Sequence, residues 1–507
     1  MQNNENTSKL TADLQENLTF IKYLLPSEDI LSYAFSTADN VDCAIIYADG
    51  MVNKQLLGDL VARPFSKLSI KESKNKTTPS AHEKLTQQIQ QTLLFPELKE
   101  ETAVEKLLKE ILDGNSVLLV DGVEMGFIIG AKFLPVRAVT EPPTDVAIKG
   151  PREGFIEDVK TNMALVRKRL KTPDLRFETL RVGRRSDTAV VLCYLQGISD
   201  EKVKQEIAEK IEKMDIDNVP DSSYIAAMLA PRRRSLFHSV GTTEKPDIFT
   251  AKIAEGRVGI LVDGSPIALT LPFLLTENLQ SSEDYFISPF SATIFRFLRL
   301  LSLFIAIFLP AFYVSAQLFK MQLFPLGLML TISSNVQELP FSPSIEMFVV
   351  LLLLEVLKEA SIRMPKYVGM SLSVVGALVL GETAVSAGFL STTSIIIVAF
   401  SGICLYTVPN FVETGSILRW LFLLAAGSLG PFGVVLLAAF ILYYLITSDA
   451  FGAPLLAPFS PFVPHDLRDA VVKYDMHSLK KRPLLFHAKN KTRLQSIENQ
   501  ENSTKTS

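Results

Sequence analysis

The sequence has few of the residues on which disulfide-bonded, metal-binding and catalytic proteins depend. Its three cysteines, Cys43, Cys193 and Cys404, stand far apart and form no CxxC pair, and its five histidines have no metal-ligand spacing. A disulfide framework or a zinc site is therefore not expected, and reduced thiols in a cytosolic domain fit better. The phosphate-binding GxxxxGK(S/T) loop, the GxSxG elbow and the strand-to-helix GxGxxG turn are also missing. We expect no enzyme, no catalytic residue, no metal and no cofactor.

The chain also has little net charge and no recognisable export signal. Its 51 basic and 54 acidic residues give a formal net charge of -3, which implies no nucleic-acid partner. The first residues, MQNNENTSKLTADLQENL, contain neither the basic nor the apolar segment of a secretory signal peptide. We therefore expect the polar region before the first apolar run to stay in the cytoplasm. Nearly all the charge lies before Ser291 and after Ser448.

Between these limits the chain has a series of long apolar runs. They include LLSLFIAIFLPAFYVSA, MFVVLLLLEVL and ILRWLFLLAAGSLGPFGVVLLAAFILYYLIT. A helix crosses a bilayer with roughly 20 apolar residues. We therefore expect an α-helical multi-span membrane domain at about 290–450. Its spans are predicted at about 293–316, 345–363, 368–390, 394–409 and 416–447.

Two interruptions leave the number of spans open at about five. Prolines break the segment 322–340, which is predicted to be re-entrant or interfacial, because such backbone is tolerated at membrane depth only inside protein or beside water. The run GSLGPFG at Gly427–Gly433 divides the last span, which is either one tilted helix or two short ones. A cytoplasmic tail requires an even number of crossings, so one of these interruptions must supply the difference.

The polar region before the apolar runs repeats one pattern of elements. LLVDG at Leu118–Gly122 returns as ILVDG at Ile260–Gly264, and strand, turn and helix patterns precede each copy in the same order. Chance would explain the pentapeptide alone, but the shared order favours an internal duplication. We therefore expect an α/β cytosolic region of two duplicated subdomains, at 25–148 and 186–285.

The remaining segments are short and polar. They are predicted to be a disordered N-terminus (1–24), a basic linker helix and strand (149–185), a cytosolic C-terminal segment (451–485) and a disordered tail (486–507).

Basic side chains crowd the predicted linker. Three interpretations remain open: a solvated face of the linker helix, contact with anionic lipid headgroups, or a subunit interface that pairs arginine with carboxylates. The candidates for subunit or lipid contact are Arg152, Arg167, Lys168, Arg169, Arg184 and Arg185.

Ionisable residues inside the predicted spans are the candidate pore lining. Glu355, Lys358 and Glu359 share one helix face, and Glu346 lies near the other end of the same span. A charge inside a bilayer costs roughly 2.5–3.5 kcal/mol on insertion scales. These groups either snorkel from a helix end or line a cation path, because two carboxylates beside one ammonium leave a net negative site. Glu382 in the third span is either a packed polar contact or a second cation site.

Three stretches of the chain together resemble a known family. GPREGFIEDVKTNMALVRKRL, the run from ILVDGSPIALTLP through FLLTENLQSSEDYF, and LAPFSPFVPHDLRD are similar to the A subunits of spore germinant receptors, in the family's order and across residues 25–485. The resemblance implies a multi-pass protein of the spore inner membrane with its N-terminal domain in the cytoplasm. It implies a homo-oligomer, a pentamer, that works with a transporter-like B subunit and a lipoprotein C subunit. Membrane lipid is a further expected partner, on the basic residues given above. It also implies a nutrient-gated cation channel, and it supplies no catalytic residues.

Functions from other classes remain open beside the channel. A ring of subunits would repeat Glu355 and Glu359 around an axis, which suits a channel. A transporter or lipid-handling protein would work by alternating access, but the spans show no inverted repeat. A scaffold that only docks partner subunits is the third alternative.

Overall fold

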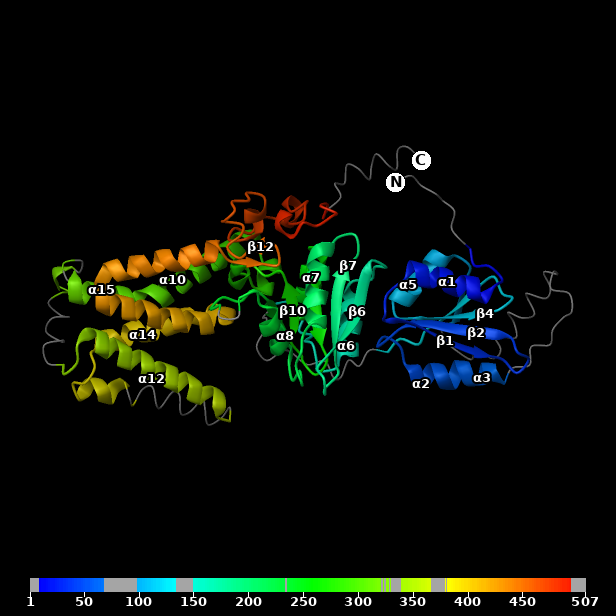
Figure 1. The fold of residues 1–507 in the computed structure, drawn as a ribbon, viewed down its shortest axis with the longest axis horizontal. Helices are drawn as coiled ribbons and strands as arrows, with labels where there is room; N and C mark the ends of the chain where they lie inside the picture. The colour runs from blue at the N-terminus through cyan, green and yellow to red at the C-terminus, as the bar shows by residue number, and fades with distance from the viewer. Residues whose placement is uncertain are drawn as a thin grey trace.

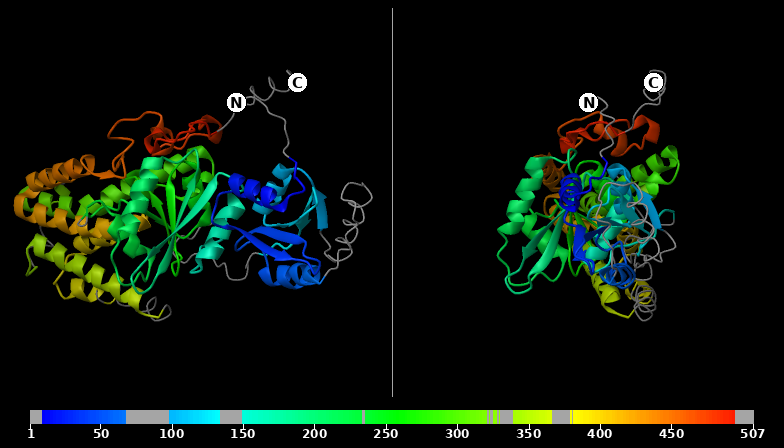
Figure 2. Two further views of the ribbon diagram at one scale, coloured as in Figure 1. Left: turned by 45° about the vertical axis from the view of Figure 1, so that its right-hand side comes forward. Right: turned by 90° about the vertical axis from the view of Figure 1, so that its right-hand side faces the viewer.

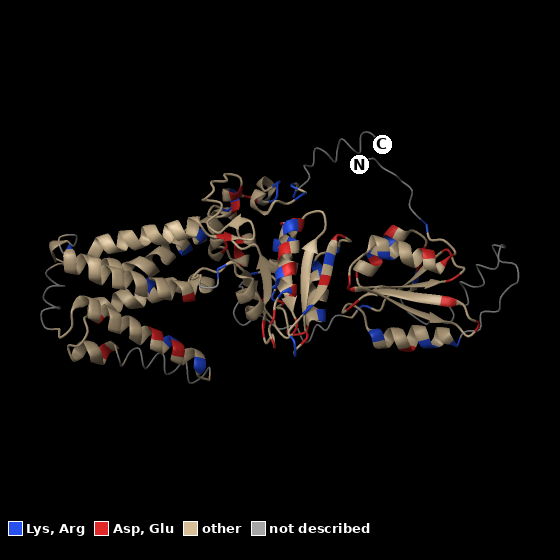
Figure 3. Ribbon diagram, in the orientation of Figure 1, with Lys and Arg blue, Asp and Glu red and all other residues tan. Residues whose placement is uncertain are grey.

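The structure is a computed structural model that describes residues 9–67, 98–133, 149–232, 235–320, 339–365 and 381–493, with a few positions between 322 and 379. Two sheet units and a group of long helices follow one another along the molecule (Figure 1). Lysine, arginine, aspartate and glutamate residues are frequent along the two sheet units and sparse along most of the long helices (Figure 3).

The first unit is a five-stranded sheet with helices on both faces. Its elements are α1 (Leu14–Leu24), β1 (Ile30–Ser36), β2 (Asp42–Ala48), α2 (Lys54–Leu57), η1 (Gly58–Ala62), α3 (Arg63–Ser66), β3 (Leu98–Glu101), α5 (Val104–Leu112), β4 (Ser116–Val120) and β5 (Gly126–Ile129). The strand order is β1-β2-β4-β5-β3, with antiparallel neighbours throughout. Side chains of β2 alternate between two cores: Ala44 and Ile46 pack with α1 and α5, and Cys43 and Ile45 pack with α2 and α3.

The second unit has the same strand order, β6-β7-β9-β10-β8, and is also antiparallel. Its elements are α6 (Val159–Arg169), β6 (Leu175–Val182), β7 (Thr188–Leu195), α7 (Glu201–Glu212), α8 (Ser222–Leu229), β8 (Gly241–Thr243), α9 (Pro246–Ala254), β9 (Val258–Val262) and β10 (Ala268–Leu271).

The aspartates of the two DG turns make equivalent hydrogen bonds in the two units. Asp121 accepts a hydrogen bond from the backbone N–H of Leu14 at 3.2 Å, and Asp263 accepts one from that of Val159 at 3.3 Å. Each carboxylate therefore satisfies a backbone donor at the start of the unit's first helix, where helices have unpaired N–H groups. The motif that predicted a duplication thus ties the first helix of each unit to the sheet.

Three predicted boundaries need correction. The segment 149–185 is no linker, because α6 and β6 are the first helix and an edge strand of the second unit. The N-terminus predicted to be disordered contains α1, which Asp13 caps and whose Leu14 and Ile21 are buried. The tail predicted to be disordered from 486 is packed as far as 493: Ala488 is buried, and the N–H of Lys489 donates to the Ile198 carbonyl at 3.0 Å.

Long apolar helices make up most of the next region. Its elements are α10 (Pro289–Phe319), α12 (Pro343–Arg363), α14 (Thr392–Leu405), η5 (Pro409–Phe411) and α15 (Val412–Ile446). Two short helices, η2 (Leu275–Leu279) and η3 (Ser282–Tyr285), precede α10 and end the second unit. Among the described residues, Pro289–Phe319 and Pro409–Ile446 are long and apolar enough to cross a membrane. Residues 368–378 and 380 of the predicted span 368–390, and most of the predicted re-entrant segment 322–340, lie outside the described residues.

The helix α15 folds back on itself at Gly430. This residue has φ 60° and ψ -144°, outside the helical region, and Pro431 follows it. The ring of Phe237 lies 6.2 Å from that of Phe411 and 6.0 Å from that of Tyr444, so the two ends of α15 lie together. Of the two alternatives for residues 416–447, the structure has two short antiparallel helices (Figure 1).

The C-terminal segment returns from α15 to the second unit. Its elements are β11 (Asp449–Ala450), β12 (Ala453–Pro454), η6 (Asp466–Asp469), η7 (Met476–Ser478) and η8 (Leu484–Phe486). Leu485 and Phe486 pack with Leu274 of the second unit, and Nε of Arg482 donates to the Ala254 carbonyl at 2.8 Å. Figure 2 shows this segment along one side of the second unit and the start of α10.

Candidate functional site

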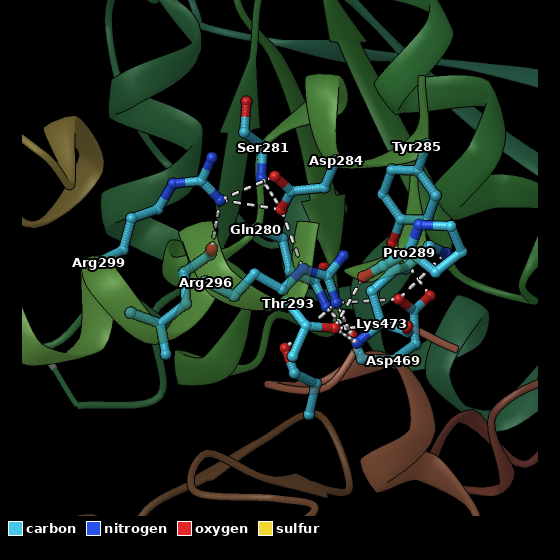
Figure 4. Close-up of polar contacts among 12 residues, drawn as sticks. Gln280, Ser281, Asp284, Tyr285, Pro289, Thr293, Arg296, Arg299, Asp469 and Lys473 are labelled. Atoms are coloured by element: carbon cyan, nitrogen blue, oxygen red, sulfur yellow. Dashed lines mark hydrogen bonds and ion pairs between the residues drawn. The ribbon is translucent and has the colours of Figure 1, made fainter. Parts of the chain in front are cut away.

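Two arginines near the start of α10 bind the end of the second unit. Arg296 is fully buried, and its Nε donates to Oδ2 of Asp284 at 2.9 Å. Nη1 of Arg299 donates to Oδ1 and Oδ2 of the same carboxylate at 3.0 and 2.9 Å, and to the Leu279 carbonyl at 3.0 Å. Helix positions three apart share a face, so both arginines reach one aspartate (Figure 4).

Asp469 of the C-terminal segment completes this cluster. Nη1 of Arg296 donates to Oδ1 of Asp469 at 3.0 Å and to its carbonyl at 2.7 Å. The Tyr285 hydroxyl donates to Oδ2 at 3.0 Å, and the Lys473 ammonium lies 3.3 Å from Oδ1. Gln280 Nε2 donates to the same carbonyl at 2.6 Å. We call these six residues the junction cluster: Asp284, Tyr285, Arg296, Arg299, Asp469 and Lys473.

Burial and charge decide what the junction cluster does. Desolvation of the Tyr285 hydroxyl, together with the negative charge of Asp469 that accepts its hydrogen bond, raises the pKa of Tyr285. Burial also lowers the pKa of Lys473, whose ammonium lies 3.9 Å from the centre of the Tyr285 ring. Removing one partner of a buried ion pair costs about 3–5 kcal/mol, because the other charge stays buried. The second unit, α10 and the C-terminal segment are therefore held together at one point.

The sequence shows the residues of the junction cluster, but it does not indicate which of them contact one another. Asp284 and Tyr285 belong to the SSEDYF run and Asp469 to the HDLRD run, two of the stretches that carry the family resemblance. Asp284 and Asp469 lie 185 residues apart, so no local spacing indicates that they share one arginine. The one local signal was the pair of arginines opening an apolar helix.

A second polar cluster lies among the long helices and centres on Glu355 of α12. Nη2 of Arg419 lies 2.8 Å from Oε1 of Glu355, and Lys358 pairs with Oε2 of the same carboxylate. Arg419 also donates to Ser401 Oγ at 3.2 Å, and Ser401 donates in turn to the Ala306 carbonyl at 2.8 Å. These contacts join α12, α15, α14 and α10.

The other predicted pore residues lie apart from this cluster. Glu359 is exposed and pairs with Arg363, 2.6 Å away at the end of α12. Glu346 is buried and accepts a hydrogen bond from the N–H of Ser391 at 2.7 Å, at the start of α14. Glu382 is exposed. The structure therefore brings Glu355 and Lys358 together and leaves the other three acidic residues separate.

Arg419 was not among the candidate residues predicted from the sequence, and it changes the net charge of the cluster around Glu355. Two carboxylates beside one ammonium were expected to leave a net negative site, but Glu355 contacts both Arg419 and Lys358, and Glu359 has Arg363. The cluster around Glu355 therefore carries one excess positive charge. The available signal was the lone arginine in ILRWLF, since a buried charge in an apolar run requires a partner.

The basic residues of the former linker have different environments. Arg167 is buried and binds Asp29 of the first unit through Nε at 2.9 Å and Nη2 at 2.7 Å. It therefore joins the two units inside the chain, instead of facing lipid or another subunit. Lys168 and Arg169 pair with Glu153, at 2.8 and 2.9 Å.

The other three candidates lie at the surface. Arg184 and Arg185 are exposed and lie beside Asp217, at 3.0 and 3.8 Å. Arg152 is exposed as well. Contact of these three positions with lipid or with another subunit stays a prediction. Among the residues that the structure describes, no group of three or more His, Cys, Asp or Glu side chains is placed to hold a metal ion.

Comparison with known proteins gives a consistent set of relatives. The model of the GerA family, "Bacillus/Clostridium GerA spore germination protein", matches residues 19–485. The chain is 33% identical over 457 residues to spore germination protein KA of Bacillus subtilis, covering 90% of this chain and 82% of that protein. It is 34% identical over 477 residues to the uncharacterised membrane protein YfkQ of the same organism, covering 94% and 91%.

A solved structure is also similar. It is the N-terminal domain of the A subunit of the Bacillus megaterium spore germinant receptor GerK3, 29% identical, with a TM-score of 0.39. The likeness covers 52% of this chain and 96% of that one.

Proposed function

Because the chain belongs to the GerA family of spore germination proteins, we propose that it is the A-type subunit of a spore germinant receptor and forms a nutrient-gated cation channel in the spore inner membrane. The observation that carries the proposal is the extent of the family match, residues 19–485, which includes both sheet units, the long helices and the C-terminal segment. Transporter-like B and lipoprotein C subunits are the proposed partners.

The proposed topology places the two sheet units and the C-terminal segment in the cytoplasm. Arginines near the start of α10 favour a cytoplasmic start. Asp469 binds Arg296, so the C-terminal segment and the start of α10 share one side, which requires an even number of crossings. Six crossings meet this requirement: α10, α12, the predicted span 368–390, α14 and the two halves of α15.

The proposed pore lies along α12. Four large apolar side chains recur on this helix at spacings of three or four and are exposed in the single chain: Ile345, Phe348, Leu352 and Val356. In a ring of subunits, proposed to be a pentamer, such a stripe would face the axis and gate it by excluding water. Glu359 would stand at the cytoplasmic end of the pore, with Glu355 behind the stripe and held by Arg419.

The junction cluster is proposed to transmit the nutrient signal. A nutrient bound by a partner subunit must move α12 to open the axis. Arg296 and Arg299 of α10 are one of the connections between the long helices and the second unit. Asp284 connects these arginines to the second unit, and Asp469 connects them to the C-terminal segment. A shift of either segment therefore displaces the start of α10.

Potassium release from spores tests the proposal. Spores that carry Glu359→Gln in place of the natural chain should release potassium more slowly on nutrient addition, with the protein present at its normal level. The matched control is Glu413→Gln, an exposed acidic residue in the first turn of α15. Equal release from the two variants would remove Glu359 from the ion path, and normal release from spores lacking the chain and its relatives would contradict the proposed function.

A further inference from the structure

Two neighbouring helices of the second unit differ in the chemistry of their outer faces. α7 and α8 pack on one core cluster, through Ile207 and Ile211 of α7 and Ile225 and Leu229 of α8. α7 reads EKVKQEIAEKIE and presents lysines and glutamates to solvent. α8 reads SSYIAAML and contains no charged residue. An exposed helix in water normally has a charged outer face, so the surroundings of α8 differ from those of α7.

The outer face of α8 carries two large apolar side chains. Tyr224 is 48% exposed and Met228 is 43% exposed. They lie one helical turn apart on one face, and the small residues Ser223 and Ala227 are exposed beside them. An apolar face with a tyrosine at its edge suits an environment that is part apolar and part aqueous.

The chain after α8 lies against both ends of α15. Nη2 of Arg232 donates to the Thr447 carbonyl at 3.1 Å, and its Nη1 donates to Ser448 Oγ at 3.3 Å, just beyond the last turn of α15. The Leu236 carbonyl accepts a hydrogen bond from Thr414 Oγ1 at 2.6 Å, in the first turn of α15. α8 therefore lies on the side of the second sheet toward the long helices, close to where they end (Figure 1).

We propose that the outer face of α8 rests in the headgroup layer of the bilayer, beside the ends of α15, and anchors the second unit to the membrane surface. Tyrosine is enriched at this depth, and Met228 would reach the upper acyl chains. Arg232 is exposed and bound to the end of α15, so in this placement it would also face lipid phosphates. The inference rests on the proposed function, because it requires α15 to cross the membrane.

Tryptophan fluorescence tests the inference, because the chain contains a single tryptophan, Trp420, within α15. Tyr224→Trp is introduced together with Trp420→Phe, and the full chain is reconstituted in vesicles of phosphatidylglycerol and phosphatidylethanolamine. A nitroxide-labelled lipid quenches from the headgroup depth, and acrylamide quenches from water. We expect the new tryptophan to emit at shorter wavelength than an aqueous one and to lose most of its emission to the labelled lipid. If Trp420→Phe unfolds the helices, Tyr224→Trp in the parent gives the same readout by difference.

The control is Tyr33→Trp in β1, where Tyr33 is 54% exposed in the first unit. Its emission should fall with acrylamide and not with labelled lipid. If acrylamide and not labelled lipid quenches the tryptophan at position 224, as at position 33, while labelled lipid quenches Trp420 of the parent, α8 does not contact the membrane. The proposed anchor is then overturned, and the proposed membrane placement of α15 is unaffected. If position 224 is shielded from both quenchers, a second copy or a partner protein covers α8 and the inference is also overturned. If no labelled lipid quenches Trp420, the proposed membrane placement of α15 is contradicted, and the proposed anchor through α8 is contradicted as well.

Discussion

Arg419 determines how the acidic residues of α12 should be tested. Glu355 is held by Arg419 and Lys358, whereas Glu359 has an exposed partner, Arg363. A joint Glu355 and Glu359 replacement would therefore combine two effects. Loss of Glu355 leaves the buried Arg419 unpaired, and loss of Glu359 removes a charge from the proposed pore. The single variants separate the stability effect from the conduction effect.

Glu355→Gln should destabilise the helices more than Glu359→Gln. Breaking a buried pair costs about 3–5 kcal/mol, and an exposed helical pair contributes about 0.3–0.5 kcal/mol. Thermal denaturation in detergent, followed by the loss of helical circular dichroism, measures the difference. Equal midpoints for the two variants would show that Arg419 does not depend on Glu355.

We predict that Glu277 makes the stability of residues 274–279, beside the junction cluster, depend on pH. Burial alone would raise the pKa of Glu277, but Arg257 and Lys252, at 2.6 and 2.9 Å, outweigh burial and lower it. A lowered carboxyl pKa contributes stability that is complete above the ordinary carboxylate range and is lost as pH falls through the lowered value. We expect residues 274–279 to exchange amide hydrogens faster under acid. Glu277→Gln should remove that pH dependence, and an unchanged pH profile in this variant would assign the effect to another group.

At the scale of the element, α15 depends on Gly430. The residue has a positive φ of 60°, and a Cβ there would lie 2.7 Å from the ring of Phe319. Gly430→Ala should therefore strain the turn and loosen the packing of α15 against α10. Gly381→Ala is the matched control, because among the described residues no atom outside its own stretch of helix lies within 4 Å of the added Cβ. Limited proteolysis in detergent should cleave the Gly430 variant faster, and equal rates would show that the turn tolerates a side chain.

The elements that the sequence predicted well are those with local signals. Apolar runs predicted α10, α12 and α14, and GSLGPFG marked the position of the break in α15, although one tilted helix was an equal alternative. The DG turns predicted a duplication, and the two sheets have the same strand order. α6 was predicted to be part of a linker because it lies between the two repeated patterns, whereas its Arg167 is buried against Asp29 of the first unit, 138 residues away. Long-range pairs such as this one, and the pair of Arg419 with Glu355, leave no periodic signal in the sequence.

At the scale of the whole molecule, three segments meet where the soluble units end and the long helices begin. The second unit contributes Asp284, α10 contributes Arg296, and the C-terminal segment contributes Asp469. In the proposed topology this meeting point lies at the cytoplasmic membrane surface, and α8 lies beside it. The arrangement fixes the start of α10, the first span of the proposed channel subunit, to the second unit and to the C-terminal segment.

The current through a planar bilayer that contains the purified oligomer with its partner subunits is the most direct test of this account. We predict that nutrient opens a current of potassium or sodium ions down their gradients, without a co-substrate, and that Glu359→Gln reduces it while the assembly keeps its size. A correctly assembled receptor that passes no current with nutrient, or that moves ions only in exchange for another solute, would contradict the account.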